Sequence, residues 1–187
     1  MNGILNEVEH ARIIADMDRI ALLGGIQPKF LYESMKPYCG LLEVEWVQKF
    51  QTYRVKGLHG LILEGVDNPD VKCQAIAGAL IRNYIDARVI PLNALFDMKE
   101  EGGVPSPTVL LIPNLFVCSY GKTVTAWKMQ IIYDLLLSRA IKNKPSVLWI
   151  ESMAKLQEQW GKPFHDFLSN FKIVTKNESH GNGNGVK

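Results

Sequence analysis

Five short apolar runs without polar alternation, separated by stretches of helical periodicity, constrain the fold of this chain most strongly. Such runs are typical of strands in sheets covered on both faces, and the helices between them supply the crossovers that parallel strands need. The pattern predicts a three-layer α/β domain with a central, mostly parallel five-stranded sheet. We expect 61–63, 108–112 and 147–150 to be its central strands. The five predicted strands are 60–63, 88–92, 108–112, 146–150 and 172–174.

The helical patterns complete the domain plan. They fall at 6–23, 43–56, 69–85, 93–98 and 125–142. We expect Asn68 to cap the helix over 69–85, because asparagine is a favoured N-cap and Pro69 suits the first turn. The length of 187 residues fits a single domain. We therefore predict an N-terminal helix in 1–24, the α/β domain in 25–175 and a disordered tail in 176–187.

Composition favours an intracellular globular protein. The chain is 47% hydrophobic with a net charge of +2. Its apolar runs are far shorter than the roughly 20 residues that cross a membrane, and the first residues show no signal-peptide pattern. Three cysteines without a C-x-x-C spacing fit a reducing compartment. We expect a cytoplasmic protein with no membrane association, no disulfide and no metal site.

The stretch 58–85 has the order of a phosphate-binding loop: a buried strand, a turn at Gly65 and an apolar helix. A working loop reads G-x-x-x-x-G-K-[ST], so that backbone N–H groups, a lysine and a hydroxyl hold phosphates and Mg²⁺. Here the second glycine is missing, Lys72 comes one residue late, and Cys73 replaces the hydroxyl. Asp67 and Asp70 would repel an anion at the helix start. The sequence predicts a closed or empty site.

The strand expected to hold a magnesium-binding acid also lacks it. The apolar run 107–115 has the form of a Walker B strand, but it contains Pro113 and Asn114 where the acids belong. A literal Gly121-Lys122-Thr123 follows the same strand. Phe116 occupies the position of its first loop glycine, so a surface turn with Thr123 capping the next helix is the favoured interpretation over a second phosphate-binding loop.

The last third of the chain is basic: residues 119–187 carry twice as many basic as acidic residues. This bias suits an acidic protein or nucleic-acid partner, with a solvated helix face as the alternative. Trp46 and Trp160 are the aromatic residues we expect to be exposed, whereas Trp127 and Trp149 are expected in the core. The basic candidates for a partner or nucleic-acid surface are Lys128, Arg139, Lys142 and Lys144.

Four segments add a family resemblance. They are GIQPKF at 25–30, GLHGLILEG at 57–65, KPSVLWI at 144–150 after Arg139, and LQEQWG at 156–161. In order and spacing they resemble the AAA+ domain of the bacterial helicase-loader family, the DnaC/DnaI-type loaders and the related IstB transposition ATPases, over roughly 20–175. The resemblance implies a P-loop NTPase-like fold and a place in DNA replication.

The resemblance also implies that the ATPase chemistry is gone. The family's sensor asparagine falls at Glu151, and its trans-acting arginines fall at Pro163 and Phe167. Phosphoryl transfer depends on positioned cations and a bound metal. We therefore predict a pseudo-ATPase that needs no cofactor. Its degenerate nucleotide pocket would comprise Gly65, Lys72, Cys73, Asn114 and Glu151.

The predicted function is binding without catalysis. We expect a helicase-loader-like protein that binds a replicative helicase, a loader or an initiator and modulates replication, in a phage or plasmid setting. One alternative is an active ATP-dependent loader or transposition helper with an atypical P-loop, which would use ATP or ADP with Mg²⁺. Another is a single-stranded DNA-binding module that uses the lysine-rich third.

Overall fold

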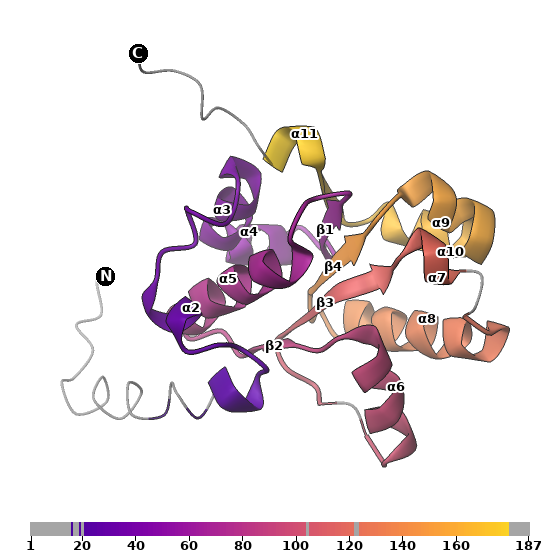
Figure 1. Cartoon of the computed structure of the whole chain (residues 1–187), viewed down its shortest axis with the longest axis horizontal. Helices are drawn as coiled ribbons and strands as arrows, with labels where there is room; N and C mark the ends of the chain where they lie inside the picture. Colours follow the sequence, from indigo (N-terminus) through magenta and orange to yellow (C-terminus); the bar gives the residue numbers. More distant parts are fainter. Residues whose placement is uncertain (1–15, 17–18, 20, 104, 122–123, 180–187) are drawn as a thin grey trace.

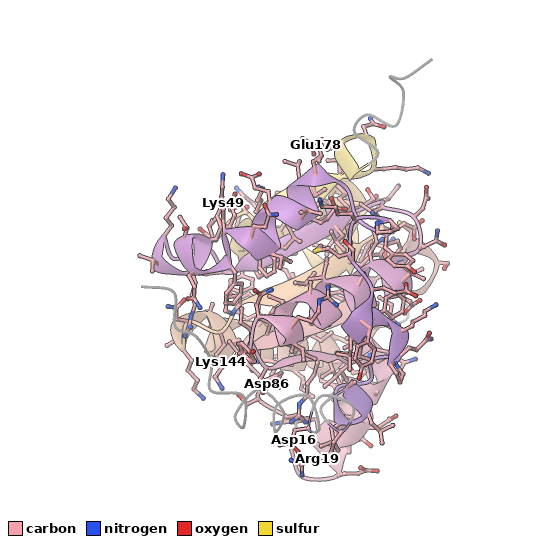
Figure 2. All side chains as sticks on the ribbon, turned by 90° about the vertical axis from the view of Figure 1, so that its left-hand side faces the viewer. Asp16, Arg19, Lys49, Asp86, Lys144 and Glu178 are labelled. Carbon is pink, nitrogen blue, oxygen red and sulfur yellow. The ribbon has the colours of Figure 1, made fainter. Side chains whose placement is uncertain are left out.

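The computed structural model describes residues 16, 19, 21–103, 105–121 and 124–179. Most of the helix expected over 6–23 and the end of the chain from residue 180 lie outside these residues. Of the described ends, Figure 2 shows Asp16 and Arg19 far from Glu178, at opposite ends of the molecule.

The centre of the molecule is a five-stranded parallel sheet (Figure 1). Its order is β2-β3-β4-β1-β5, and each neighbouring pair is parallel. The predicted α/β class, the parallel sheet and the three central strands are confirmed. The strands are β1 (Gly60–Glu64), β2 (Ala87–Val89), β3 (Val109–Phe116), β4 (Ser146–Ile150) and β5 (Lys172–Thr175).

Helices cover both faces of the sheet, as Figure 1 shows. One face packs against α2 (Lys29–Tyr32), α3 (Leu41–Gln48), α4 (Phe50–Val55) and α5 (Pro69–Arg82). The other packs against α6 (Leu92–Glu100), α8 (Ala126–Ile141), α9 (Met153–Trp160) and α10 (Lys162–Leu168). Strand alternation divides the two cores: Leu61 and Leu63 face the first, whereas Ile62 faces the second. The short helices α7 (Cys118–Gly121) and α11 (Lys176–Ser179) lie near strand ends.

The segment before the sheet is fixed on α5 by a close backbone contact. A Cβ atom added at Gly78 of α5 would lie 2.0 Å from the Phe30 carbonyl oxygen, so only glycine fits there. From the end of α5, the Arg82 guanidinium donates to the carbonyls of Phe30 and Leu31 at 2.6 and 3.0 Å. The GIQPKF segment is therefore held on α5 as part of the domain.

Several boundaries differ from the sequence-based expectation. The helix predicted over 43–56 is two helices, because the backbone leaves helical geometry at Lys49. Strand β3 continues through Pro113 to Phe116, and its register with β4 shifts between Ile112 and Phe116, an irregularity of the kind that accommodates proline. The tail begins later than expected, since 176–179 form α11 and the Glu178 carboxylate accepts bonds from the Thr175 N–H and hydroxyl.

The predicted exposure of the aromatic residues was partly wrong. Trp46 and Trp160 are buried, at 1% and 9% exposure, and pack edge-on against Phe50 and Phe116 respectively. Trp127, expected in the core, is 52% exposed. None of the helices in the described part of the chain is long and apolar enough to cross a membrane.

Candidate nucleotide-binding site

The carboxyl ends of β1, β3 and β4 meet at one edge of the sheet, close to α7 and α9 (Figure 1). In open parallel α/β sheets this edge is where ligands bind, and a phosphate would lie at the start of the helix after β1. Gly65 and Glu151 directly follow β1 and β4, and Asn114 lies near the end of β3. The fold thus brings the predicted pocket residues to the expected edge, and their bonding partners show what each of them does.

The loop between β1 and α5, residues 65–68, is fastened to the neighbouring strand. Gly65 has φ of 60°, and its N–H donates to the Ile150 carbonyl at 2.9 Å. The indole N–H of Trp149 donates to the Val66 carbonyl at 2.8 Å. Asn68 adopts a left-handed conformation and makes no side-chain cap bond, so the predicted capping role is wrong. These bonds hold the loop against β4.

Lys72, the only lysine of the degenerate loop, is sequestered inside the protein. Its ammonium Nζ lies 3.1 Å from Oε1 of Glu43 on α3, and the two side chains are 8% and 0% exposed. The side chain is therefore not solvated, and its charge is paired within the protein. Because a buried charge is stable only when paired, this lysine is committed to joining α3 with α5.

Cys73, in the position of the magnesium-binding hydroxyl, is fully buried. Burial raises the pKa of its thiol well above the usual value. The neighbouring Cys39 thiol contacts the Lys72 carbonyl at 4.0 Å, and burial raises its pKa to about 12. Both thiols are therefore neutral at physiological pH. A neutral buried thiol is a poor ligand for Mg²⁺, which prefers oxygen.

Polar side chains at the carboxyl edge accept hydrogen bonds from the first residues of helices. Oδ1 of Asn114 accepts from the N–H of Leu92, which begins α6, at 2.8 Å. Oε2 of Glu151 accepts from the N–H of Cys118, which begins α7, at 2.7 Å. The sequence did not single out Glu64, yet its Oε1 accepts from the N–H that begins α9 at 2.8 Å.

These three bonds give the edge a structural role. The first N–H groups of a helix have no partner within the helix, and an acidic side chain there also suits the helix dipole. Asn114 and Glu151, at the positions where a nucleotide site would bind metal and sense nucleotide, thus accept hydrogen bonds from the N-termini of helices. In the described ranges no group of three histidine, cysteine or acidic residues is placed to bind a metal.

The positions of the trans-acting arginines are also structural. Pro163 lies in the first turn of α10, where proline is well tolerated. Phe167 is buried, with ring contacts to His59, Tyr133 and Phe171 at 5.3 to 5.8 Å. Neither side chain can supply positive charge to a neighbouring subunit.

The literal GKT segment does not follow a phosphate-binding turn. Phe116 belongs to β3 and pairs with Ile150 of β4, and Gly121 is the last residue of α7. Lys122 and Thr123 lie outside the described residues. The next helix begins after Thr125, which makes no side-chain cap bond.

The four basic candidates do not form one exposed surface. Arg139 is buried, at 4% exposure, so its side chain does not lie on an exposed surface. Lys144 donates to the carbonyl and hydroxyl of Ser106 at 2.8 and 2.9 Å. The ammonium of Lys128 lies 4.8 Å from the centre of the Phe96 ring. Lys142 is exposed.

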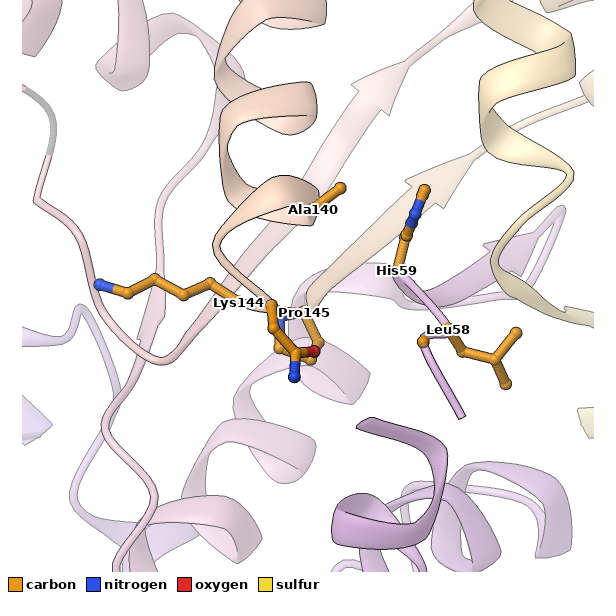
Figure 3. A pocket seen from close by; sticks show the side chains of 7 residues that line it. Leu58, His59, Ala140, Lys144 and Pro145 are labelled. Carbon is orange, nitrogen blue, oxygen red and sulfur yellow. The ribbon is translucent and has the colours of Figure 1, made fainter. Parts of the chain in front are cut away.

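A pocket of about 210 Å³ lies at the opposite, amino edge of the sheet, where residues 57–59 and 143–145 lead into β1 and β4 (Figure 3). The His59 ring packs against Phe167 and Phe171, with centroids 5.3 and 5.7 Å away. The Lys144 side chain extends away from His59 (Figure 3). Burial lowers the pKa of His59, so the ring is neutral at physiological pH. This pocket is separate from the expected nucleotide edge.

No protein-family model matches the sequence, and no curated protein sequence matches it. Similarity is found among solved structures. A replication initiator DnaA bound to AMPPCP and single-stranded DNA superposes with a TM-score of 0.59 at 12% identity, over 82% of this chain and 52% of that one. AMPPCP-bound DnaA from Aquifex aeolicus gives 0.59 at 12% identity, over 80% and 50%.

The structure of DnaI superposes with a TM-score of 0.56 at 13% identity, over 80% of this chain and 90% of that chain. The present chain thus spans about half the length of the initiators and nearly all of the DnaI structure. Identities this low concern the fold alone. The chain has an α/β fold with a five-stranded all-parallel sheet, and this fold is similar to those of the DnaA and DnaI structures.

Proposed function

We propose that this protein is a non-catalytic, helicase-loader-like AAA+ domain that binds a replicative helicase, a loader or an initiator and modulates DNA replication. The observation that carries the proposal is the buried ion pair of Lys72 with Glu43. It removes the one loop lysine from the edge where a triphosphate would lie. A pseudo-ATPase of this kind suits a phage or plasmid setting.

The remaining groups of the site support the same conclusion. Phosphoryl transfer relies on a lysine, backbone N–H donors, a metal held by an acid, and an arginine from a neighbouring subunit. Here Asn114 and Glu151 hold helix starts, and Phe167 fills a hydrophobic cluster. Each position has a structural use in place of a catalytic one. Neither ATP nor Mg²⁺ is needed for such a protein to act.

Without that chemistry, the domain acts through its surface. AAA+ subunits assemble side by side and complete each other's nucleotide sites, which this chain does not do. It is expected to dock on one face of a helicase, loader or initiator and to tether or block it. The candidate docking surfaces are the N-terminal segment 1–24 and the exposed side of α8 around Lys128 and Lys142.

The test combines direct binding with turnover. The purified chain would be titrated against purified replicative helicase, loader and initiator of the same host by biolayer interferometry, in parallel with an ATPase assay. We expect saturable binding to one of the three without ATP, and no turnover above background. Turnover comparable to that of an active loader, abolished by changing Lys72 but not Lys122, would overturn the proposal. Absence of binding to any of the three partners would also overturn it.

Two further variants test the docking surfaces. Deletion of residues 1–24, or charge reversal at Lys128 and Lys142, should weaken binding of the partner while leaving a cooperative thermal transition. Charge reversal at Lys36 and Lys162, two exposed lysines elsewhere, is the matched control. If both test variants bind the partner as tightly as the parent does, the assigned surfaces are wrong.

A further inference from the structure

Basic side chains from two separate segments, the end of α6 and residues 139–144, line one pocket beside the carboxyl-terminal part of α8. The pocket measures about 230 Å³ and lies next to the segments that lead into β3 and β4, away from the carboxyl edge. None of the described residues that line it is acidic. Its basic residues are Lys99 in α6, Arg139 in α8, and Lys142 and Lys144, which follow α8. The other lining residues are Pro105, Ser106, Leu135 and Ser138.

Arg139 carries a buried positive charge that only neutral groups contact directly. Its Nε donates to the Ser146 hydroxyl at 3.0 Å, and Nη1 donates to the Pro107 carbonyl at 3.2 Å. Its Nη2 donates to the carbonyls of Thr108 and Pro145 at 3.2 and 3.0 Å. Carbonyl oxygens orient the guanidinium but leave its net charge in place. An anion nearby would be strongly favoured at low local dielectric.

The charge state of Arg139 is compatible with this role. Burial lowers its pKa to about 10, and Asp86 acts in the opposite direction. The side chain therefore stays protonated at neutral pH. Asp86 itself lies 3.9 Å from Arg88, and no carboxylate in the described part of the chain lies within 4.0 Å of the Arg139 guanidinium.

Lys99 and Lys142 supply cations for a ligand. Both are exposed, and within the described ranges neither forms an ion pair. The Lys144 ammonium donates hydrogen bonds to Ser106, and these bonds fix one wall of the pocket. Helix dipoles favour cations near the ends of α6 and α8, which accounts for three of the basic residues separately. The helix dipoles do not explain why the ends of α6 and α8 and residue 144 line the same pocket.

The size of the pocket limits the ligand. At about 230 Å³ it is smaller than the roughly 300–1,000 Å³ typical of small-molecule sites. It suits a compact anion, and lysine and arginine together are characteristic phosphate-binding groups. We propose that this pocket binds a phosphate group, supplied either by free phosphate or by a single-stranded nucleic acid. Lys142 also belongs to the docking surface proposed above, but the inference does not rest on the proposed function, because phosphate binding is measured without any protein partner.

Calorimetric titration with inorganic phosphate tests the site, and fluorescence anisotropy with a labelled single-stranded oligonucleotide distinguishes the source. The test variant is Lys99→Gln with Lys142→Gln. The control is Lys36→Gln with Lys162→Gln, which removes the same charge from exposed positions elsewhere. Thermal melts of all three proteins check that each is folded.

We expect the test variant to bind the active probe at least about tenfold more weakly, since two charge-assisted contacts are lost. The control should stay within about twofold of the parent. Binding of phosphate alone would identify a free anion as the ligand, and binding of the oligonucleotide would identify a strand. The proposal is overturned if neither probe binds the parent, or if test and control variants lose affinity equally.

Discussion

The buried pair of Lys72 and Glu43 should make a large contribution to stability that can be isolated by a double-mutant cycle. Its atoms are 3.1 Å apart and both side chains are almost fully covered. Removing one partner takes the opposite charge away from a buried ion pair, which typically costs about 3–5 kcal/mol. Total unfolding free energies of domains are only about 5–15 kcal/mol. Either Lys72→Met or Glu43→Leu alone should therefore lower stability severely.

The double variant should recover much of this loss. Replacing both members of a buried ion pair by apolar groups of similar size is often neutral or stabilising. We expect the free energy of unfolding, from urea titrations followed by circular dichroism, to be higher for Glu43→Leu/Lys72→Met than for either single variant.

An exposed ion pair provides the matched control. Lys155 and Glu158 on α9 lie 3.0 Å apart, with side chains 56% and 62% exposed. Such pairs contribute roughly 0–1 kcal/mol, so Lys155→Met should change stability little. The reasoning is refuted if Lys72→Met costs no more than Lys155→Met, or if the losses at Lys72 and Glu43 simply add. Additive losses would mean that the two side chains do not depend on each other.

Two further predictions concern the fold itself. Gly78→Ala should destabilise the domain by more than about 1 kcal/mol despite the higher helix propensity of alanine, because the added Cβ would lie 2.0 Å from the Phe30 carbonyl oxygen of α2. The control is Gly103→Ala, where the added Cβ meets open space. Equal melting temperatures for the two variants would contradict this contact. The Glu45 carboxylate accepts bonds from Lys49 and Lys172, which lower its pKa from 4.5 to about 2. The stability that these two lysine contacts provide is present above the usual carboxyl pKa and is lost as pH falls toward about 2. The parent should therefore lose more unfolding free energy than Glu45→Gln between about pH 5 and pH 2. Parallel stability profiles of the two proteins would contradict this prediction.

The sheet could be predicted from the sequence because its signal is local. Runs such as 108–112 and 146–150 are apolar on successive residues, and only a strand covered on both faces buries every one of them. Helix positions followed from periodicity in the same way. Boundaries were less predictable: continuation of β3 through Pro113 depends on a register shift against β4, which is a property of two strands together.

The roles of charged residues could be predicted only in part. Loss of the phosphate-binding pattern was visible at Lys72, but its partner Glu43 lies 29 residues away and on another helix. Likewise, Arg139 looked like a surface residue because the carbonyls that hold it come from segments up to 32 residues distant. Trp160 ends an amphipathic helix whose buried side becomes clear only when α9 is placed on β3.

We propose above that this domain combines a fold similar to that of DnaA and DnaI with a nucleotide site that no longer works. The most direct test is equilibrium binding of a fluorescent ATP analogue with Mg²⁺, followed by competition with unlabelled ATP. The comparison protein is Glu43→Leu/Lys72→Met, which is expected to stay folded and lacks the loop lysine. The account predicts no saturable binding up to millimolar nucleotide in either protein. Micromolar binding by the parent that ATP displaces, and that the double variant loses while remaining folded, would contradict it.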